Sequence, residues 1–186
     1  MQPHSLILAV PLELLLVSAV VWDLRQRRIP NALVMAGAVV GVLLQGLLAG
    51  HDGALAAIQG LGIGLIVLLP GYLAGFTGAG DVKLMAAIGT FLGPYDVFLA
   101  ALASIAVGGV IALGFAAGAL FSRSSPSPWP RYGLMVRTLV TTGKPIYVAP
   151  AEGEVMGRKF PYAVSIAIGT TLFLLWQSPW LAGLIR

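Results

Sequence analysis

Long apolar runs separated by short polar turns dominate the pattern of this chain. We expect six membrane helices, at residues 6–22, 32–48, 55–73, 82–92, 97–121 and 162–176. A helix needs about 20 apolar residues to cross the hydrocarbon core of a bilayer. The fourth run is shorter and would reach only ~17 Å at ~1.5 Å per residue, so we do not expect it to cross without its flanking residues.

Composition favours a lipid-embedded fold over a soluble one. The 186 residues are 58% hydrophobic and only 10% charged, whereas soluble domains carry roughly 25% charged residues. In lipid, backbone hydrogen bonds must close within helices. The sequence therefore predicts an all-α fold, a polytopic transmembrane helix bundle, with residues 1–186 forming a single domain.

The basic residues lie between the apolar runs and predict the topology. With the N-terminus outside, the cytoplasmic loops are 23–31, 74–83 and 122–161, and they contain ten of the eleven lysines and arginines. This positive-inside pattern indicates an even number of spans and places both termini outside. The net charge of +4 is thus a sign of topology, and we expect the lipid bilayer as a partner and no nucleic acid.

The longest loop, 122–161, begins with a stretch rich in serine and proline that cannot continue a helix. Further along, residues 132–140 place apolar side chains between basic ones. A short amphipathic helix at the membrane interface and an irregular loop both fit this segment.

Glycines inside the apolar runs predict close packing between helices, because they remove the side chains that keep backbones apart. We expect this role for Gly60, Gly62, Gly64, Gly108, Gly109, Gly114 and Gly118.

Two of the seven acidic residues are notable for their positions. Asp23 follows the first apolar run and Asp81 precedes the fourth, so the predicted topology places both at the cytoplasmic boundary. Acids beside membrane spans are costly and are functional candidates, although a helix cap or a partner for nearby arginines is the simpler explanation. If the two carboxyls meet, they share a proton. One can then activate a water while the other protonates a carbonyl.

The other acids have simpler roles. Asp52 and Asp96 lie in short outer turns, where they favour the turn or cap a helix. Glu13 lies about 15 Å of helix rise from Asp23, and we expect it to be protonated or hydrogen-bonded within the bundle. Because the chain has no cysteine, disulfides, cysteine-based zinc sites and a thiol nucleophile are excluded. A pair of aspartates needs no metal and no cofactor.

Gly78 and Gly80 precede Asp81. We expect them to allow positive φ and the close approach of a peptide strand. Lys83 lies two positions after Asp81, so on a helix it points away from that carboxyl and anchors the helix end among the head groups.

Three segments resemble the type IV prepilin peptidases, which are membrane aspartic proteases. Residues 78–84 resemble the Gly-x-Gly-Asp-x-Lys signature of that family, and residues 23–31 resemble its first aspartate followed by basic residues and Ile-Pro-Asn. Residues 159–163 resemble its short proline-aromatic segment before the last span. The chain begins close to its first span and lacks cysteine, so it resembles the short form that serves tight-adherence or Flp-type pili, and this resemblance does not imply methylation of the product.

The resemblance implies that Asp23 and Asp81 are the catalytic pair, with Gly78, Gly80 and Lys83 shaping the motif around the second. It implies cleavage of prepilin leaders after a glycine, at the cytoplasmic face of the bacterial inner membrane, with the pilus assembly machinery as a further partner.

Other classes of protein remain open. A small transporter or proton-conducting membrane protein fits the composition equally well, although only Glu13 lies at the mid-membrane depth where transport sites usually lie. A non-catalytic subunit of a secretion system and a presenilin-like or preflagellin-type protease are further alternatives. Cleavage of a pilin precursor by the purified protein separates the peptidase from the non-proteolytic classes, and the choice of substrate separates the proteases.

Four residues are candidates for substrate binding: Pro30, Asn31, Glu152 and Glu154. Because prepilin leaders are basic and the predicted cytoplasmic face is basic too, Glu152 and Glu154 would offset the repulsion. Reversing both charges, Glu152→Lys with Glu154→Lys, is expected to raise KM for a basic leader by a few-fold. Unchanged cleavage would contradict this role.

Overall fold

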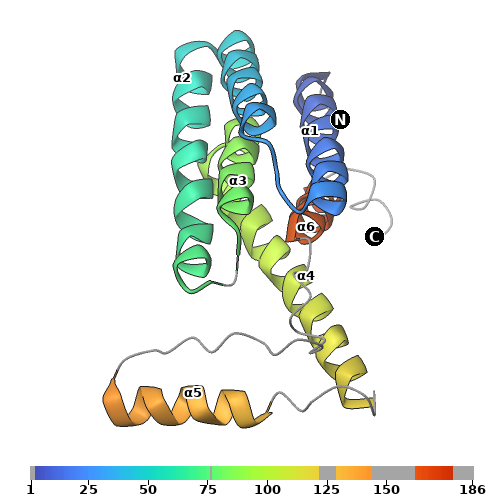
Figure 1. Cartoon of the computed structure of the whole chain (residues 1–186). Coiled ribbons are helices and arrows are strands. Elements are labelled where there is room, and N and C mark those ends of the chain that lie inside the picture. The colour runs from blue at the N-terminus through green and yellow to red at the C-terminus, as the bar shows by residue number, and fades with distance from the viewer. Residues whose placement is uncertain (1–2, 76, 122–128, 144–161, 178–186) are drawn as a thin grey trace, which may run out of the picture. The chain divides into compact units, whose positions relative to one another are not determined.

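The computed structural model describes residues 3–75, 77–121, 129–143 and 162–177. Its elements are α1 (Pro3–Gln26), α2 (Asn31–Leu73), α3 (Ala79–Leu92), α4 (Pro94–Phe121), α5 (Trp129–Thr142) and α6 (Tyr162–Gln177) (Figure 1). All regular structure in these residues is helical, so the predicted all-α class is confirmed. Three stretches of the described helices are long and apolar enough to cross a membrane, Ile7–Gln26, Asn31–Leu73 and Pro94–Gly114, and α6 is a shorter apolar helix.

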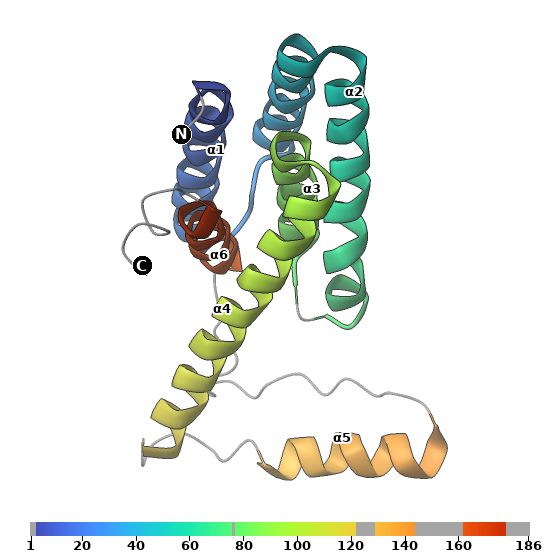
Figure 2. The same cartoon turned by 180° about the vertical axis from the view of Figure 1, so that it is seen from behind.

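α2 contains two of the predicted spans, because its backbone breaks at Gly50. This glycine has φ 62° and ψ −143°, which is not helical and suits a residue without a Cβ. The two arms run side by side and are joined at one end in both views (Figures 1 and 2). The predicted runs 32–48 and 55–73 correspond to these arms.

The chain divides into two compact units. One comprises Met1–Gly108 together with Pro161–Arg186, and the other comprises Gly109–Phe160. The first unit therefore contains α1, α2, α3, α6 and the beginning of α4, and the second contains α5. The single peptidase domain expected for residues 1–186 stays a prediction.

α3 is the central helix of the first unit. From Val82 to Phe91 every residue except Lys83 is buried. Its 14 residues extend ~21 Å at ~1.5 Å per residue, less than the ~30 Å hydrocarbon core of a bilayer. Neighbouring helices surround this short helix, which explains how so brief an apolar run is accommodated.

α2 and α3 touch backbone to backbone. A Cβ on Gly60 would collide with the carbonyl oxygen of Gly89, a Cβ on Gly89 with that of Gly60, and a Cβ on Gly64 with the carbonyl oxygen of Met85. The packing role predicted for Gly60 and Gly64 is confirmed.

The other glycines predicted to pack behave differently. A Cβ on Gly108 would lie 3.0 Å from the ring of Tyr162, so this glycine also makes a close contact. Gly62, Gly109 and Gly114 have nothing within 4 Å of an added Cβ among the described residues, and their predicted role is wrong. These positions face away from the neighbouring helices. The surroundings of Gly118 lie outside what the structure describes.

Gly60→Ala is expected to lower the free energy of unfolding by about 1–3 kcal/mol, because overpacking forces the backbones of α2 and α3 apart. Gly62→Ala is the matched control, two residues away on the same helix, and is expected to be neutral or slightly stabilising. Thermal unfolding of both variants in detergent micelles measures the difference. Equal stability of the two variants would contradict the contact.

Candidate active site

Asp23 and Asp81 lie at the same end of the first unit. The C-terminal end of α1 and the N-terminal end of α3 are at corresponding heights in both views (Figures 1 and 2). Each aspartate is only 8% exposed. The charge of Asp23 acts on Asp81, so the structure brings the two predicted acids within electrostatic reach of each other.

Asp81 is held by the first turn of its own helix. Its Oδ2 accepts a hydrogen bond of 2.9 Å from the backbone N–H of Gly78, the residue that caps α3. Its own N–H donates to the Gly78 carbonyl at 3.1 Å. The side chain thus closes one half of a capping box, and this fixes the orientation of the carboxyl while Oδ1 remains for a further partner.

The expectation that Gly78 and Gly80 adopt positive φ is wrong. Gly78 is extended, with φ −85° and ψ 155°, and Gly80 lies inside α3. Their lack of a side chain serves to make space. A Cβ on Gly78 would lie 3.1 Å from Asp81 Oδ2, and one on Gly80 would lie 3.4 Å from Ile29. The left-handed conformation before α3 belongs to Gly75, with φ 80°.

The environment of Asp81 favours its protonated form. Burial raises the pKa of Asp81 from 3.8 to about 6, the Gly78 N–H opposes this shift, and the charge of Asp23 adds to it. Desolvation and a like charge both disfavour a second carboxylate at this place.

Asp23 has a different set of neighbours. The backbone N–H of Ala163, at the start of α6, donates a hydrogen bond to its carboxyl, and Arg27 acts on it electrostatically. Arg27 follows the last residue of α1 and has φ 53°, and its N–H donates to the Asp23 carbonyl at 2.8 Å, as in helix ends with a left-handed residue. Asp23 Oδ2 is buried and has no hydrogen-bond partner among the described residues.

The start of α6 contributes two groups that the sequence did not predict. One is the Ala163 N–H beside Asp23, and the other is the phenol of Tyr162, on which the charge of Asp81 acts. Residues 159–163 were noticed only for their resemblance to a family segment. A backbone donor leaves no signature in the sequence, whereas the aromatic residue at a helix start was a usable signal.

A hydrogen bond between Lys83 and Asn31 connects residues 78–84 to residues 23–31, and it lies outside the acid pair. The Lys83 Nζ donates to Asn31 Oδ1 at 3.0 Å, and both side chains are exposed. This bond joins the start of α3 to the start of α2, where half-buried Pro30 is the cap residue. The roles expected for Pro30 and Asn31 in substrate binding and for Lys83 among the head groups stay predictions.

The remaining acids are placed elsewhere. Glu13 accepts hydrogen bonds of 3.0 and 3.2 Å from Thr171 Oγ1, so the expected bond within the bundle is present. Asp96 accepts a hydrogen bond of 3.0 Å from Gln177, and Asp52 is almost fully exposed beside His51.

Glu152 and Glu154 lie outside the described residues. Within the described ranges, no three His, Cys, Asp or Glu side chains come together as metal ligands.

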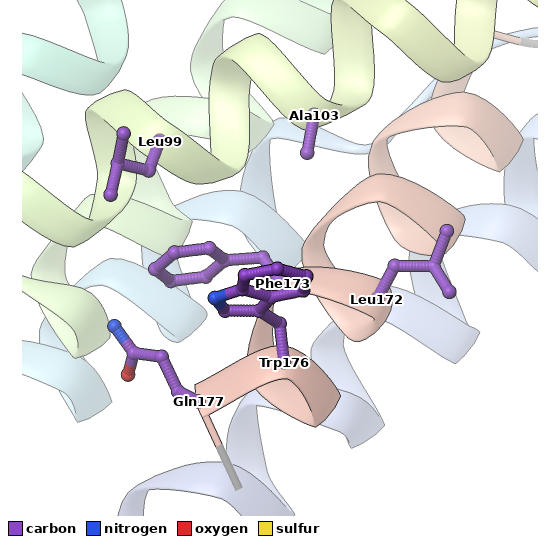
Figure 3. Close-up of a pocket in the computed structure, with 6 residues that line it drawn as sticks. All are labelled: Leu99, Ala103, Leu172, Phe173, Trp176 and Gln177. Carbon is purple, nitrogen blue, oxygen red and sulfur yellow. The ribbon is translucent and has the colours of Figure 1, made fainter. Parts of the chain in front are cut away.

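An apolar hollow of about 410 Å³ lies between α4 and α6 (Figure 3), lined by Leu99, Ala103, Leu172, Phe173, Trp176 and Gln177. Its lining contains one amide and no titratable group, so it offers no acid or base for hydrolysis. The chemistry that the described residues offer is concentrated in the acid pair.

A comparison with family models identifies a match over part of the chain. The model of the type IV leader peptidase family matches residues 11–113, more than half of the chain, and this range contains both acids of the pair. No curated protein and no solved structure matches the chain significantly.

The raised pKa of Asp81 predicts a pH-dependent stability. At pH values between the unfolded pKa of Asp81, near 3.9, and its folded value of about 6, the folded state binds more protons than the unfolded state. The free energy of unfolding of the wild-type protein therefore falls as pH rises through about 6. Asp81→Asn removes this loss, and we expect it to raise the free energy of unfolding by up to about 3 kcal/mol at pH 7.5. The gain should vanish as pH falls towards 4.

Thermal unfolding in detergent as a function of pH measures this difference. Asp52→Asn, on an exposed side chain, is the control. A constant difference between Asp81→Asn and the wild type at all pH values would show that burial does not favour the protonated acid.

Proposed function

We propose that this chain, which belongs to the type IV leader peptidase family, is an aspartic endopeptidase that removes the leaders of prepilins by means of Asp23 and Asp81. Family membership implies a peptidase with prepilin-like substrates, and the long apolar helices support a multi-pass membrane protein. The observation that carries the catalytic assignment is the pair of 8%-exposed carboxyls on two different helices, coupled by charge.

The two acids divide the work between them. Asp23 is ionised and takes a proton from a water that attacks the scissile carbonyl carbon. In the reactive form of the pair, Asp81 holds the shared proton and gives it to the carbonyl oxygen, which forms a neutral gem-diol. Return of the Asp23 proton to the leaving nitrogen, with transfer of a diol proton back to Asp81, breaks the C–N bond and restores the starting protonation.

The surroundings of the two carboxyls support this division. Burial disfavours a charge on Asp23, and the N–H that it receives from the first turn of α6 and the charge of Arg27 oppose this effect in favour of the anion. Asp81 faces the charge of Asp23, and burial raises its pKa to about 6. Oδ2 of Asp23, which is buried and has no hydrogen-bond partner in the described part of the chain, is the oxygen that we assign to the water. The charge of Asp81 acts on the phenol of Tyr162, and we assign this side chain a contact with the substrate.

The distribution of charge supports cleavage at the cytoplasmic face of the inner membrane, with both termini outside. The acid pair lies at the end of the first unit that contains the loops 23–31 and 74–83, which the positive-inside pattern assigns to the cytoplasm. The absence of cysteine in the sequence supports a substrate of the Flp type. A transporter or proton conductor has only the composition in its favour, since Glu13 is already hydrogen-bonded to Thr171.

Asp23→Asn and Asp81→Asn are each expected to lower kcat/KM for leader cleavage by about 10²–10⁴-fold, because each removes one partner of the acid–base pair. The purified protein in lipid vesicles is incubated with an Flp-type prepilin, and the shortened product is measured by mass spectrometry. Asp52→Asn, remote and exposed, should cleave like the wild type.

The folded state of each variant is checked by thermal unfolding, so that loss of cleavage is not confused with loss of structure. Normal processing by either variant would refute the acid pair. Processing of a classical prepilin in preference to the Flp type would overturn the substrate class but leave the chemistry in place.

A further inference from the structure

α5 lies in the second unit and presents exposed apolar side chains. Leu134, Val136, Leu139 and Val140 are between 48% and 79% exposed. In a helix with 100° per residue, Val136, Leu139 and Val140 share one face with Met135, whereas Arg137, Thr138, Thr141 and Thr142 lie towards the other. Leu134 departs from this division. Three or four adjacent apolar side chains on one face form a surface that water does not favour.

The polar face of α5 satisfies its own hydroxyl groups. Thr138 donates to the Leu134 carbonyl at 2.7 Å, Thr141 to the Arg137 carbonyl at 2.8 Å, and Thr142 to the Thr138 carbonyl at 2.6 Å. These hydroxyls therefore do not depend on water for a hydrogen-bond acceptor. Such a helix loses little when it enters a region where water is scarce, such as the boundary between head groups and acyl chains.

The charge of this segment indicates the kind of surface it fits. Residues 122–144 contain Arg123, Arg131, Arg137 and Lys144 and no acidic residue. Basic side chains near an anionic lipid surface contribute about 1 kcal/mol each. An acid-free basic segment matches anionic head groups better than it matches another copy of this basic chain.

The chain connection keeps α5 near a bilayer. The preceding helix, α4, contains the stretch Pro94–Gly114, which is long and apolar enough to cross a membrane. Between the end of α4 at Phe121 and the start of α5 at Trp129 there are few residues, and such a linker reaches at most about 25 Å when fully extended. α5 can therefore reach the membrane surface at which α4 emerges.

We propose that α5 is an interfacial anchor, a helix that lies in the plane of the membrane with Val136, Leu139 and Val140 in an anionic lipid surface. Helices of this kind combine an apolar face with basic residues on the polar side and bury the apolar face ~5–10 Å into the boundary region. This proposal does not depend on the peptidase chemistry, because it uses no residue of the acid pair.

The absence of cysteine makes a direct test simple. Val136→Cys and Thr138→Cys place single thiols two residues apart, on opposite sides of α5. Each full-length variant is labelled with the fluorophore NBD and reconstituted in vesicles of equal parts phosphatidylcholine and phosphatidylglycerol. Lipids brominated on the acyl chain then serve as quenchers.

We expect blue-shifted emission and about twofold or greater quenching at position 136 relative to position 138, since only the apolar face reaches acyl chains at a depth of ~5–10 Å. The contrast should weaken in pure phosphatidylcholine vesicles and when Arg137→Gln is added to the labelled variant. Position 138 reports on the same helix, so a helix that failed to form would give equal signals at both positions.

Three results would overturn the anchor. Equal quenching at both positions would show that α5 has no lipid-facing side. Protection of position 136 only after a prepilin is added would assign the face to substrate. Protection that increases with the protein-to-lipid ratio, without bromolipid quenching, would assign it to a second copy of the chain.

Discussion

The close contact between α2 and α3 determines where the second aspartate lies. α3 is short and buried along nearly all of its length, and at Gly60 and Gly89 its backbone meets that of α2 with no room for a side chain. Asp81 occupies the first turn of this helix and is held by Gly78. Because backbone contacts allow little sliding or rotation, the position of the carboxyl is set by packing along the whole helix.

The proposed acid pair requires one buried carboxyl to be ionised and the other to be protonated. Burial disfavours charge on both, so an ionised member needs donors and a neutral member needs a reason to keep its proton. Asp23 has the donor of Ala163 and the charge of Arg27, whereas Asp81 has the donor of Gly78 but is more deeply desolvated and has the charge of Asp23 beside it. The two carboxyls are chemically alike, and their neighbours on α1, α3 and α6 make them different.

Much of the fold and part of the site could be predicted from the sequence. The apolar runs identify the helices because a lipid-embedded backbone has few alternatives, and Asp23 and Asp81 are conspicuous as acids at the ends of such runs. The break at Gly50, the extended Gly78 and the bond between Lys83 and Asn31 depend on how helices pack, which a single chain pattern does not encode. For the same reason, Gly62 could not be distinguished from Gly60 in advance: both lie in one apolar run, and only one meets a neighbour.

The contact of Asp23 with α6 has a consequence for the biogenesis of the protein. Synthesis delivers both aspartates in the first half of the chain, long before Ala163 reaches the membrane. A nascent protein would therefore hold its two acids without the donor that stabilises the negative one. On the mechanism proposed above, hydrolysis would begin only after the last described helix has inserted.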